Sequence, residues 1–152
     1  MTIAISQAAP DADDVRGLLR ALDEDIGRRY PGVAIHAVSS DEMQHPQFVL
    51  LVARVDGQSI GCGGVRQLEP TVGEVKRMFV REQSRGCGVA RALLAALESE
   101  ALGRGWTLLR VETGKGQPEA IALYRSSGYV EIPPFGEYVG NPASVCFEKP
   151  LR

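Results

Sequence analysis

The segment 85–90 has the residue types and spacing best suited to binding a ligand. It reads Arg85-Gly86-Cys87-Gly88-Val89-Ala90. The run 74–80 before it alternates with a period of two and contains β-branched and aromatic residues, which predicts a strand. Apolar residues recur at helical spacing after it, as far as Ala101. Glycines at such a turn let consecutive N–H groups face one point, and a helix N-terminus attracts anions. The segment predicts a phosphate-binding turn, with a plain tight turn as the alternative.

Two common phosphate-binding motifs do not fit this segment. A P-loop would need a Lys-Ser or Lys-Thr pair, and a dinucleotide fingerprint would need glycine where the chain has Arg91. The pattern Arg/Gln-x-x-Gly-x-Gly/Ala does fit, with Arg85, Gly88 and Ala90 at its fixed positions. In this the segment resembles the pyrophosphate-binding loop of the GNAT superfamily of acetyl-CoA-dependent N-acetyltransferases.

The segment 117–129 is similar to a second signature of that superfamily, Asn-x-x-Ala-x-x-Leu/Phe-Tyr-x-x-x-Gly-Phe/Tyr. The chain departs from it by carrying Gln117 in place of the usual asparagine. The residues themselves predict a short helix that begins near Pro118 and ends at Gly128, followed by a strand. The two signatures occur in the expected order, and the resemblance extends loosely over nearly the whole chain.

Length and composition predict a single domain, 1–152. The chain has 152 residues, 44% of them hydrophobic and 24% charged, as in globular proteins. Its formal net charge of −2 gives no reason to expect a nucleic-acid or membrane partner. The N-terminal residues lack the features of a signal peptide, and no apolar run approaches the ~20 residues of a membrane span. We therefore expect a cytoplasmic protein.

The cysteines and histidines do not predict a metal site. Cys62, Cys87 and Cys146 are far apart and odd in number, which fits neither a zinc motif nor a disulfide framework. His36 and His45 add no ligand pattern. We expect no metal.

The pattern of elements predicts an α/β fold. Asp56-Gly57 predicts a hairpin turn, so the early strands should pair antiparallel and the central ones parallel. Strands are expected at 2–7, 48–55, 59–68, 73–81, 107–113, 129–132 and 144–149. Helices are expected from a cap at Asp11 or Asp13 to about Arg28, from 89 to about 104 and at 117–127, with a short helix from Ser39 or Ser40. The resemblance implies the GNAT fold, a mixed central sheet of about seven strands with helices on both faces and a splay between strands 4 and 5.

The resemblance also implies which residues bind acetyl-CoA. Backbone atoms of the fourth strand would hold the acetyl and pantetheine groups, the turn would hold the pyrophosphate, and the second signature would contribute two side chains. These residues are Met78, Phe79, Val80, Arg85, Gly86, Cys87, Gly88, Val89, Ala90, Arg91, Gln117 and Tyr124.

Acetylation of an amine needs a base for the amine proton, a donor for the oxyanion and an acid for the thiolate. The oxyanion donor would be a strand N–H near Val80. By its place in the second signature Tyr124 is the candidate acid, the alternative being an aromatic packed in the core. Glu74 is the candidate base, directly or through water, or else a carboxylate paired with a cation such as Lys76. Glu112 is a second candidate for the base.

The segment 132–142 contains three prolines and two glycines, which restrict a loop between the last two strands. Phe135, Glu137 and Tyr138 in this loop, together with Glu112, are the candidate acceptor-binding residues. A rigid connection, or a contact in a homodimer, is the alternative. A carboxylate here would suit a cationic amine.

Three functions follow from the sequence. The first is transfer of an acetyl group from acetyl-CoA to the primary amine of a small molecule, by direct attack in a ternary complex. The second is acetylation of a protein lysine or N-terminus. The third is a non-catalytic module that senses acetyl-CoA. The presence of Tyr124 argues against the third, and the short chain and rigid late loop place the second below the first.

Overall fold

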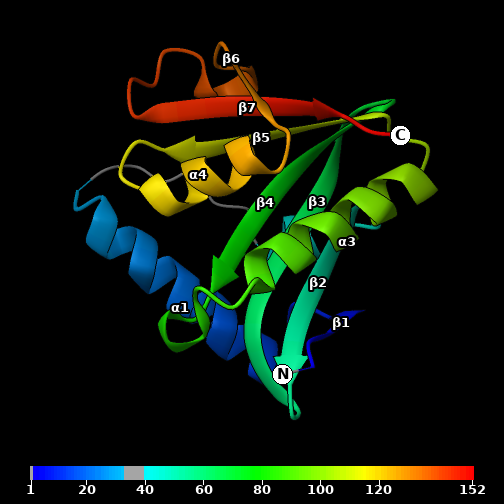
Figure 1. The fold of residues 1–152 in the computed structure, drawn as a ribbon, viewed down its shortest axis with the longest axis vertical. Helices are drawn as coiled ribbons and strands as arrows, with labels where there is room; N and C mark the ends of the chain where they lie inside the picture. The colour runs from blue at the N-terminus through cyan, green and yellow to red at the C-terminus, as the bar shows by residue number, and fades with distance from the viewer. Residues whose placement is uncertain (1, 33–39) are drawn as a thin grey trace.

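The computed structural model describes residues 2–32 and 40–152, which form a seven-stranded mixed sheet in the order β1-β2-β3-β4-β5-β7-β6 (Figure 1). The strands are β1 (Ala4–Gln7), β2 (Phe48–Val55), β3 (Gln58–Glu69), β4 (Val72–Val80), β5 (Leu108–Gly114), β6 (Val130–Ile132) and β7 (Ser144–Pro150). The helices are α1 (Asp13–Arg29), α2 (Ser40–Met43), α3 (Val89–Gly103) and α4 (Pro118–Ser126). The expected α/β class and the mixed sheet of seven strands are confirmed.

Strand β2 separates two hydrophobic cores, one on each face of the sheet. Val49 and Leu51 belong to the core that includes α3 residues such as Leu93, whereas Leu50 belongs to the core that includes α1 residues such as Leu18. Successive side chains of a strand point to opposite faces, so a strand covered by helices on both sides must be apolar throughout. This explains the apolar run 48–53 in β2 and confirms helices on both faces.

The first strands form antiparallel hairpins, as predicted. Asp56 and Gly57 both have positive φ, 51° and 79°, which is the backbone of a tight two-residue hairpin turn. β2 pairs antiparallel with β3, and β3 pairs antiparallel with β4. β4 and β5 are the parallel pair.

The pairing of β4 with β5 covers only the first half of the two strands. It runs from Val72 opposite Leu108 to Val75 opposite Val111 and then stops. β4 continues to Val80 and β5 to Gly114, and the two ribbons diverge in Figure 1. The expected splay is therefore present, and we call the space between the diverging segments the β4–β5 gap.

A backbone irregularity accompanies the splay. Arg77 has a φ of 60°, a conformation that residues other than glycine rarely adopt, and the register between β3 and β4 shifts nearby. Lys76 before it and Phe79 after it both face the α1 side, because the extra residue resets the alternation of side chains. The regular alternation expected for 74–80 did not predict this bulge.

Two expectations about the helices differ from the structure. The predicted cap at Asp11 or Asp13 is wrong: the N-cap of α1 is Ala12, which makes no side-chain hydrogen bond, and Asp13 is the first helical residue. Asp13 instead accepts a hydrogen bond from Arg16 one turn later. The short second helix does begin at Ser40, whereas the alternative start at Ser39 lies outside the described residues. In the described part of the chain, no helix is long and apolar enough to cross a membrane.

A stability test follows from the packing of β4 beside the splay. A Cβ added at Gly73 would lie 2.6 Å from the Trp106 ring and 2.8 Å from Leu109, so Gly73→Ala should lower the free energy of unfolding by about 1–3 kcal/mol. Gly103 ends α3 with open space around it, so Gly103→Ala should raise that free energy by about 0.4–1 kcal/mol. Urea unfolding measures both. An equal change in the free energy of unfolding for Gly73→Ala and Gly103→Ala would contradict the close packing of Trp106 on β4.

Candidate functional site

The end of β4 presents backbone groups to the β4–β5 gap. The N–H of Arg81 donates to the carbonyl of Ile60 on the β3 side, at 2.8 Å. Because backbone groups of a strand alternate between its two neighbours, the N–H and C=O of Val80 face away from β3, toward the gap. The Val80 carbonyl accepts a hydrogen bond from Arg85 Nε at 2.9 Å. The Val80 N–H, which we expect to be the oxyanion donor, therefore points toward the gap.

The turn that follows has the geometry of an anion-binding helix start. Gly86 and Gly88 have positive φ, 79° and 81°, and α3 begins directly after them. The first backbone bond within the helix is made by the N–H of Ala92 to the carbonyl of Gly88, at 3.0 Å. The N–H groups of Val89, Ala90 and Arg91 therefore have no acceptor within the helix. The expected pyrophosphate segment lies at this end of α3, beside the gap.

Two arginines of this segment are held by the protein. The Arg85 guanidinium lies 5.6 Å from the centre of the Phe79 ring and 3.8 Å from the carboxylate of Asp25 on α1. Arg91 donates to the hydroxyl groups of Ser126 and Ser127, at 2.9 and 3.2 Å. These contacts connect the start of α3 to α1 and to the end of α4.

The candidate acid, Tyr124, is buried on α4. Its ring packs against Tyr129 and Phe147, with centroids 5.7 and 6.0 Å apart, so the aromatic packing considered as the alternative is real. Burial, followed by the negative charge of Glu112, raises the pKa of Tyr124 above its usual value of 10.0. Its hydroxyl has no hydrogen-bond partner among the described residues. The side chain therefore keeps its proton at neutral and moderately alkaline pH.

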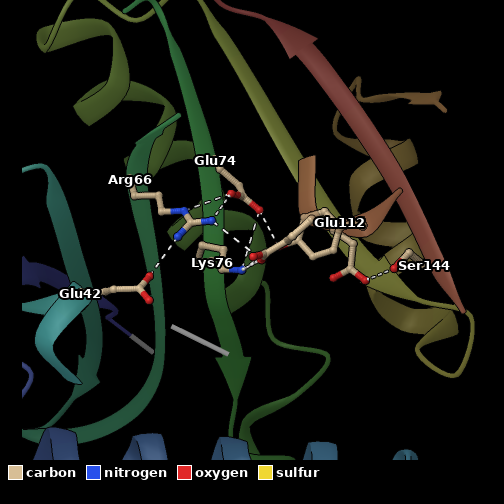
Figure 2. Close-up of polar contacts among 8 residues, drawn as sticks. Glu42, Arg66, Glu74, Lys76, Glu112 and Ser144 are labelled. Atoms are coloured by element: carbon tan, nitrogen blue, oxygen red, sulfur yellow. Dashed lines mark hydrogen bonds and ion pairs between the residues drawn. The ribbon is translucent and has the colours of Figure 1, made fainter. Parts of the chain in front are cut away.

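The candidate base, Glu74, is enclosed by its partners (Figure 2). Its carboxylate is 1% exposed, and Oε1 accepts hydrogen bonds from Arg66 Nε at 3.1 Å and Nη2 at 2.9 Å. Oε2 accepts the hydroxyl of Tyr138 at 2.7 Å, and the Tyr138 hydroxyl in turn accepts Lys76 Nζ at 2.7 Å. The interpretation of Glu74 as a carboxylate paired with cations is confirmed. Any proton it takes from an acceptor must pass through Tyr138 or a water molecule.

Burial and charge in this cluster act in opposite directions on Arg66 and in the same direction on Tyr138. Burial by itself would lower the pKa of Arg66, but the charge and hydrogen bonds of Glu74 raise it overall. Burial first, and then the charge of Glu74, raise the pKa of Tyr138 well above its usual value. Arg66 thus stays cationic and Tyr138 stays neutral, which fixes the direction of the hydrogen bond from Tyr138 to Glu74.

Exposed carboxylates contact the cations of this cluster, Arg66 and Lys76. Glu137 Oε1 is 3.7 Å from Lys76 Nζ and 3.9 Å from Arg66 Nη2, and its side chain is 44% exposed. Glu42 on α2 contacts Arg66 at 3.0 Å and is 51% exposed. We call Glu42 and Glu137 the acidic rim. The acidic rim therefore places negative charge at the surface, above two cations, Arg66 and Lys76, that already pair with Glu74.

The remaining candidates also lie on this side of the sheet. Glu112 is the first residue of β5 past the last pair with β4, and it accepts the hydroxyl of Ser144 at 2.7 Å. Figure 2 shows this bond, and the charge of Glu112 also acts on Tyr138 of the Glu74 cluster. The Phe135 ring stacks edge to face on Tyr138, with centroids 5.3 Å apart. Within the described residues there is no group of His, Cys, Asp and Glu that could hold a metal ion.

The sequence analysis missed Arg66 and Ser144 and named Lys76 only as an alternative partner. Arg66 lies opposite Glu74 in the β3–β4 register, so a cation facing an acid across two strands was the available signal. That signal required the register, which the bulge at Arg77 shifts. Gln117, in contrast, lies where expected, at the N-cap of α4.

Comparison with known proteins gives the same family from sequence and from structure. Residues 18–129 match the acetyltransferase (GNAT) family. An IAA acetyltransferase from Azospirillum brasilense is 39% identical over 150 residues, which is 98% of each chain. A Klebsiella pneumoniae protein assigned as an acyl-CoA N-acyltransferase is 34% identical, with a TM-score of 0.84 over 99% of each chain. A GNAT family acetyltransferase from Elizabethkingia anophelis, solved with acetyl-CoA bound, shares the fold, with a TM-score of 0.71, 16% identity and 98% coverage of both chains.

The cysteines provide a test of the turn before α3. Burial raises the pKa of the Cys62 thiol to about 12 and also raises the pKa of Cys146, whereas Cys87 is exposed in the turn. Ellman's reagent at pH 8 should therefore label Cys87 rapidly and the other two slowly, and acetyl-CoA should slow the rapid reaction. Cys87→Ser should remove the rapid phase. Rapid labelling that acetyl-CoA leaves unchanged would contradict donor binding at this turn.

Proposed function

The chain belongs to the acetyltransferase (GNAT) family, whose members use acetyl-CoA, and we propose that it acetylates the primary amine of a small molecule by direct attack in a ternary complex. The observation that carries this proposal is the β4–β5 gap, which meets the start of α3 at the turn 85–91. The gap offers strand N–H and C=O groups to a pantetheine arm, and the turn offers N–H groups to a pyrophosphate.

The donor would extend along β4 and end at the turn. Met78, Phe79 and Val80 would hold the acetyl and pantetheine groups through their backbone atoms. The segment 85–91 would hold the pyrophosphate, and Gln117 would lie on the opposite wall of the gap. The Elizabethkingia protein of the same fold binds acetyl-CoA, which supports this role for the fold.

The chemical step would form a C–N bond and break the thioester C–S bond. The neutral amine attacks the acetyl carbon, and the N–H of Val80 stabilises the oxyanion. Tyr124 then gives its proton to the leaving thiolate of CoA. Its raised pKa keeps the proton on Tyr124 at the working pH but also makes it a weaker acid, so the role proposed for Tyr124 rests on its place in the second signature.

The amine proton must go to a carboxylate or to water. We propose that Glu74 takes it through Tyr138 or an ordered water, since both Glu74 oxygens are already bonded. Glu112 is the alternative base, because its charge acts on Tyr124 and Tyr138 and its side chain is only half-buried. The two carboxylates differ in their distance from solvent, so their variants should differ in pH dependence.

The acceptor would lie over the acidic rim, with Phe135, Tyr138 and Glu112 around it. Surface carboxylates above cations that are already paired favour a cationic group over an anionic one. The relative named IAA acetyltransferase supports a small molecule rather than a protein as acceptor. Binding of acetyl-CoA with no thiol release on any amine of the panel below would favour the alternatives, acetylation of a protein or binding without turnover.

The proposal is tested by measuring thiol release from acetyl-CoA with each of a panel of amines. IAA, named for the relative, is tested beside them as the contrasting acceptor. The wild-type protein should release CoA in the presence of at least one amine, and Tyr124→Phe should reduce kcat roughly 10²-fold or more. Between pH 7 and pH 10 the wild-type kcat should hold or rise, because Tyr124 keeps its proton while the amine loses one. Release that needs no amine, or turnover with IAA alone, would contradict an amine acceptor.

A second test addresses the charge of the acceptor site. Glu137→Gln should raise KM for 1,4-diaminobutane about 3- to 10-fold, as expected for removing one partly exposed charge from a cationic ligand, and should leave KM for acetyl-CoA unchanged. Glu131→Gln is the matched control, because Glu131 is an exposed glutamate paired with Arg125 outside the site. An equal KM for 1,4-diaminobutane in both variants would contradict a role for Glu137 in the acceptor site.

A further inference from the structure

The last two turns of α1 contact both walls of the β4–β5 gap. Asp23 and Asp25 reach the β4 side, and Arg29 and Tyr30 reach the segment between β5 and α4. We call these four residues the α1 brace. The sequence analysis gave the brace no role, and nothing in the proposed chemistry uses it.

The β4 wall is tied to the brace at two points. Asp23 accepts a hydrogen bond from Arg77 Nη1 at 2.8 Å, and Arg77 is the residue whose left-handed backbone forms the bulge. The Arg77 side chain is only 6% exposed and that of Asp23 is 59% exposed, so Asp23 pairs with a buried arginine from the surface of α1. Asp25 lies 3.8 Å from Arg85, which also bonds the Val80 carbonyl. The brace therefore contacts β4 where it leaves the sheet and again at the turn before α3.

The β5 wall is tied to the brace through backbone groups. Arg29 donates to the carbonyl of Gly116 at 3.1 Å and forms an ion pair with Glu119. The N–H of Gly116 donates to the hydroxyl of Tyr30 at 3.1 Å, and Gln117 Nε2 lies 3.5 Å from the same oxygen. The backbone N–H and C=O of Gly116 are thus both hydrogen-bonded, to Tyr30 and to Arg29 at the end of α1.

Glycines make room for this contact. A Cβ at Gly114, the last residue of β5, would overlap the Tyr30 hydroxyl, and one at Gly116 would lie 3.2 Å from the Tyr30 ring. Neither glycine has a positive φ, so backbone conformation does not explain them. Their small size fits the ring of Tyr30 against the end of β5.

Past Val75 and Val111 no strand pairing holds β4 and β5 together, so another element must set the distance between them. A helix rises about 1.5 Å per residue, so the brace from Asp23 to Tyr30 extends roughly 10 Å. We propose that the α1 brace sets the width of the β4–β5 gap, and that Arg29 and Tyr30 are positioning residues of the donor site. This inference rests on the proposed binding of acetyl-CoA in the gap.

The inference predicts weaker donor binding when the β5 contacts are removed. Isothermal titration with acetyl-CoA should give a Kd about tenfold higher for Arg29→Gln and for Tyr30→Phe, the size expected for one lost hydrogen bond held in place. Arg29→Lys keeps the charge beside Glu119 and should recover part of the affinity. The amide of Gly116 should exchange with deuterium faster in Tyr30→Phe, and acetyl-CoA should slow that exchange in the wild type.

Arg28→Gln is the matched control for Arg29→Gln. Both arginines contact Asp25, but the Arg28 side chain is 68% exposed and only Arg29 reaches Gly116. Urea unfolding should show that both variants are folded under the binding conditions, with Arg29→Gln the less stable of the two, and only Arg29→Gln should lose affinity. Equal Kd values for wild type, Arg29→Gln and Tyr30→Phe would contradict the proposal that the α1 brace sets the width of the gap. Failure of the wild type to bind acetyl-CoA would instead overturn the proposed function.

Discussion

The structure depends on one constraint, that backbone N–H and C=O groups inside a protein need partners. β4 and β5 satisfy this constraint as far as Val75 and Val111 and then diverge, which leaves the inner edge of β4 facing a gap. An unpaired buried group costs about 1–3 kcal/mol, so a ligand with amide groups binds well there. The gap meets the turn before α3, where the first N–H groups of the helix have no acceptor within the helix. We propose that the gap and this turn together form the donor site.

The acceptor side is built on paired charges. Glu74 is buried at a cost that Arg66, Lys76 and Tyr138 offset, and removing one partner would leave a charge without its neutralising contact. Such a cluster is rigid, because each group fixes the orientation of the next. It supports the acidic rim from below and holds Glu74, the proposed proton acceptor, in a fixed position. α1 connects the two halves, since its inner face packs in the core while its last residues contact the walls of the gap.

Local patterns in the sequence predicted most of the fold. The apolar run of β2, the Asp56-Gly57 turn and the stripe of α3 are decided by neighbours in the chain, and the structure has them at nearly the predicted bounds. The bulge at Arg77 could not be predicted, because a positive φ at a residue other than glycine is imposed by the surrounding structure. The partners of Glu74 required the register of β3 with β4. The contact of Arg29 with Gly116 joins residues 87 positions apart, and no local pattern carries that information.

The most direct measurement is a crystal structure of the protein with CoA. The account predicts that the pantetheine lies between β4 and β5 and bonds the backbone of Val80, with the pyrophosphate on the N–H groups of 86–90. The thiol should then end near the hydroxyl of Tyr124. CoA bound elsewhere on the protein, with the β4–β5 gap occupied by side chains, would contradict the central claim.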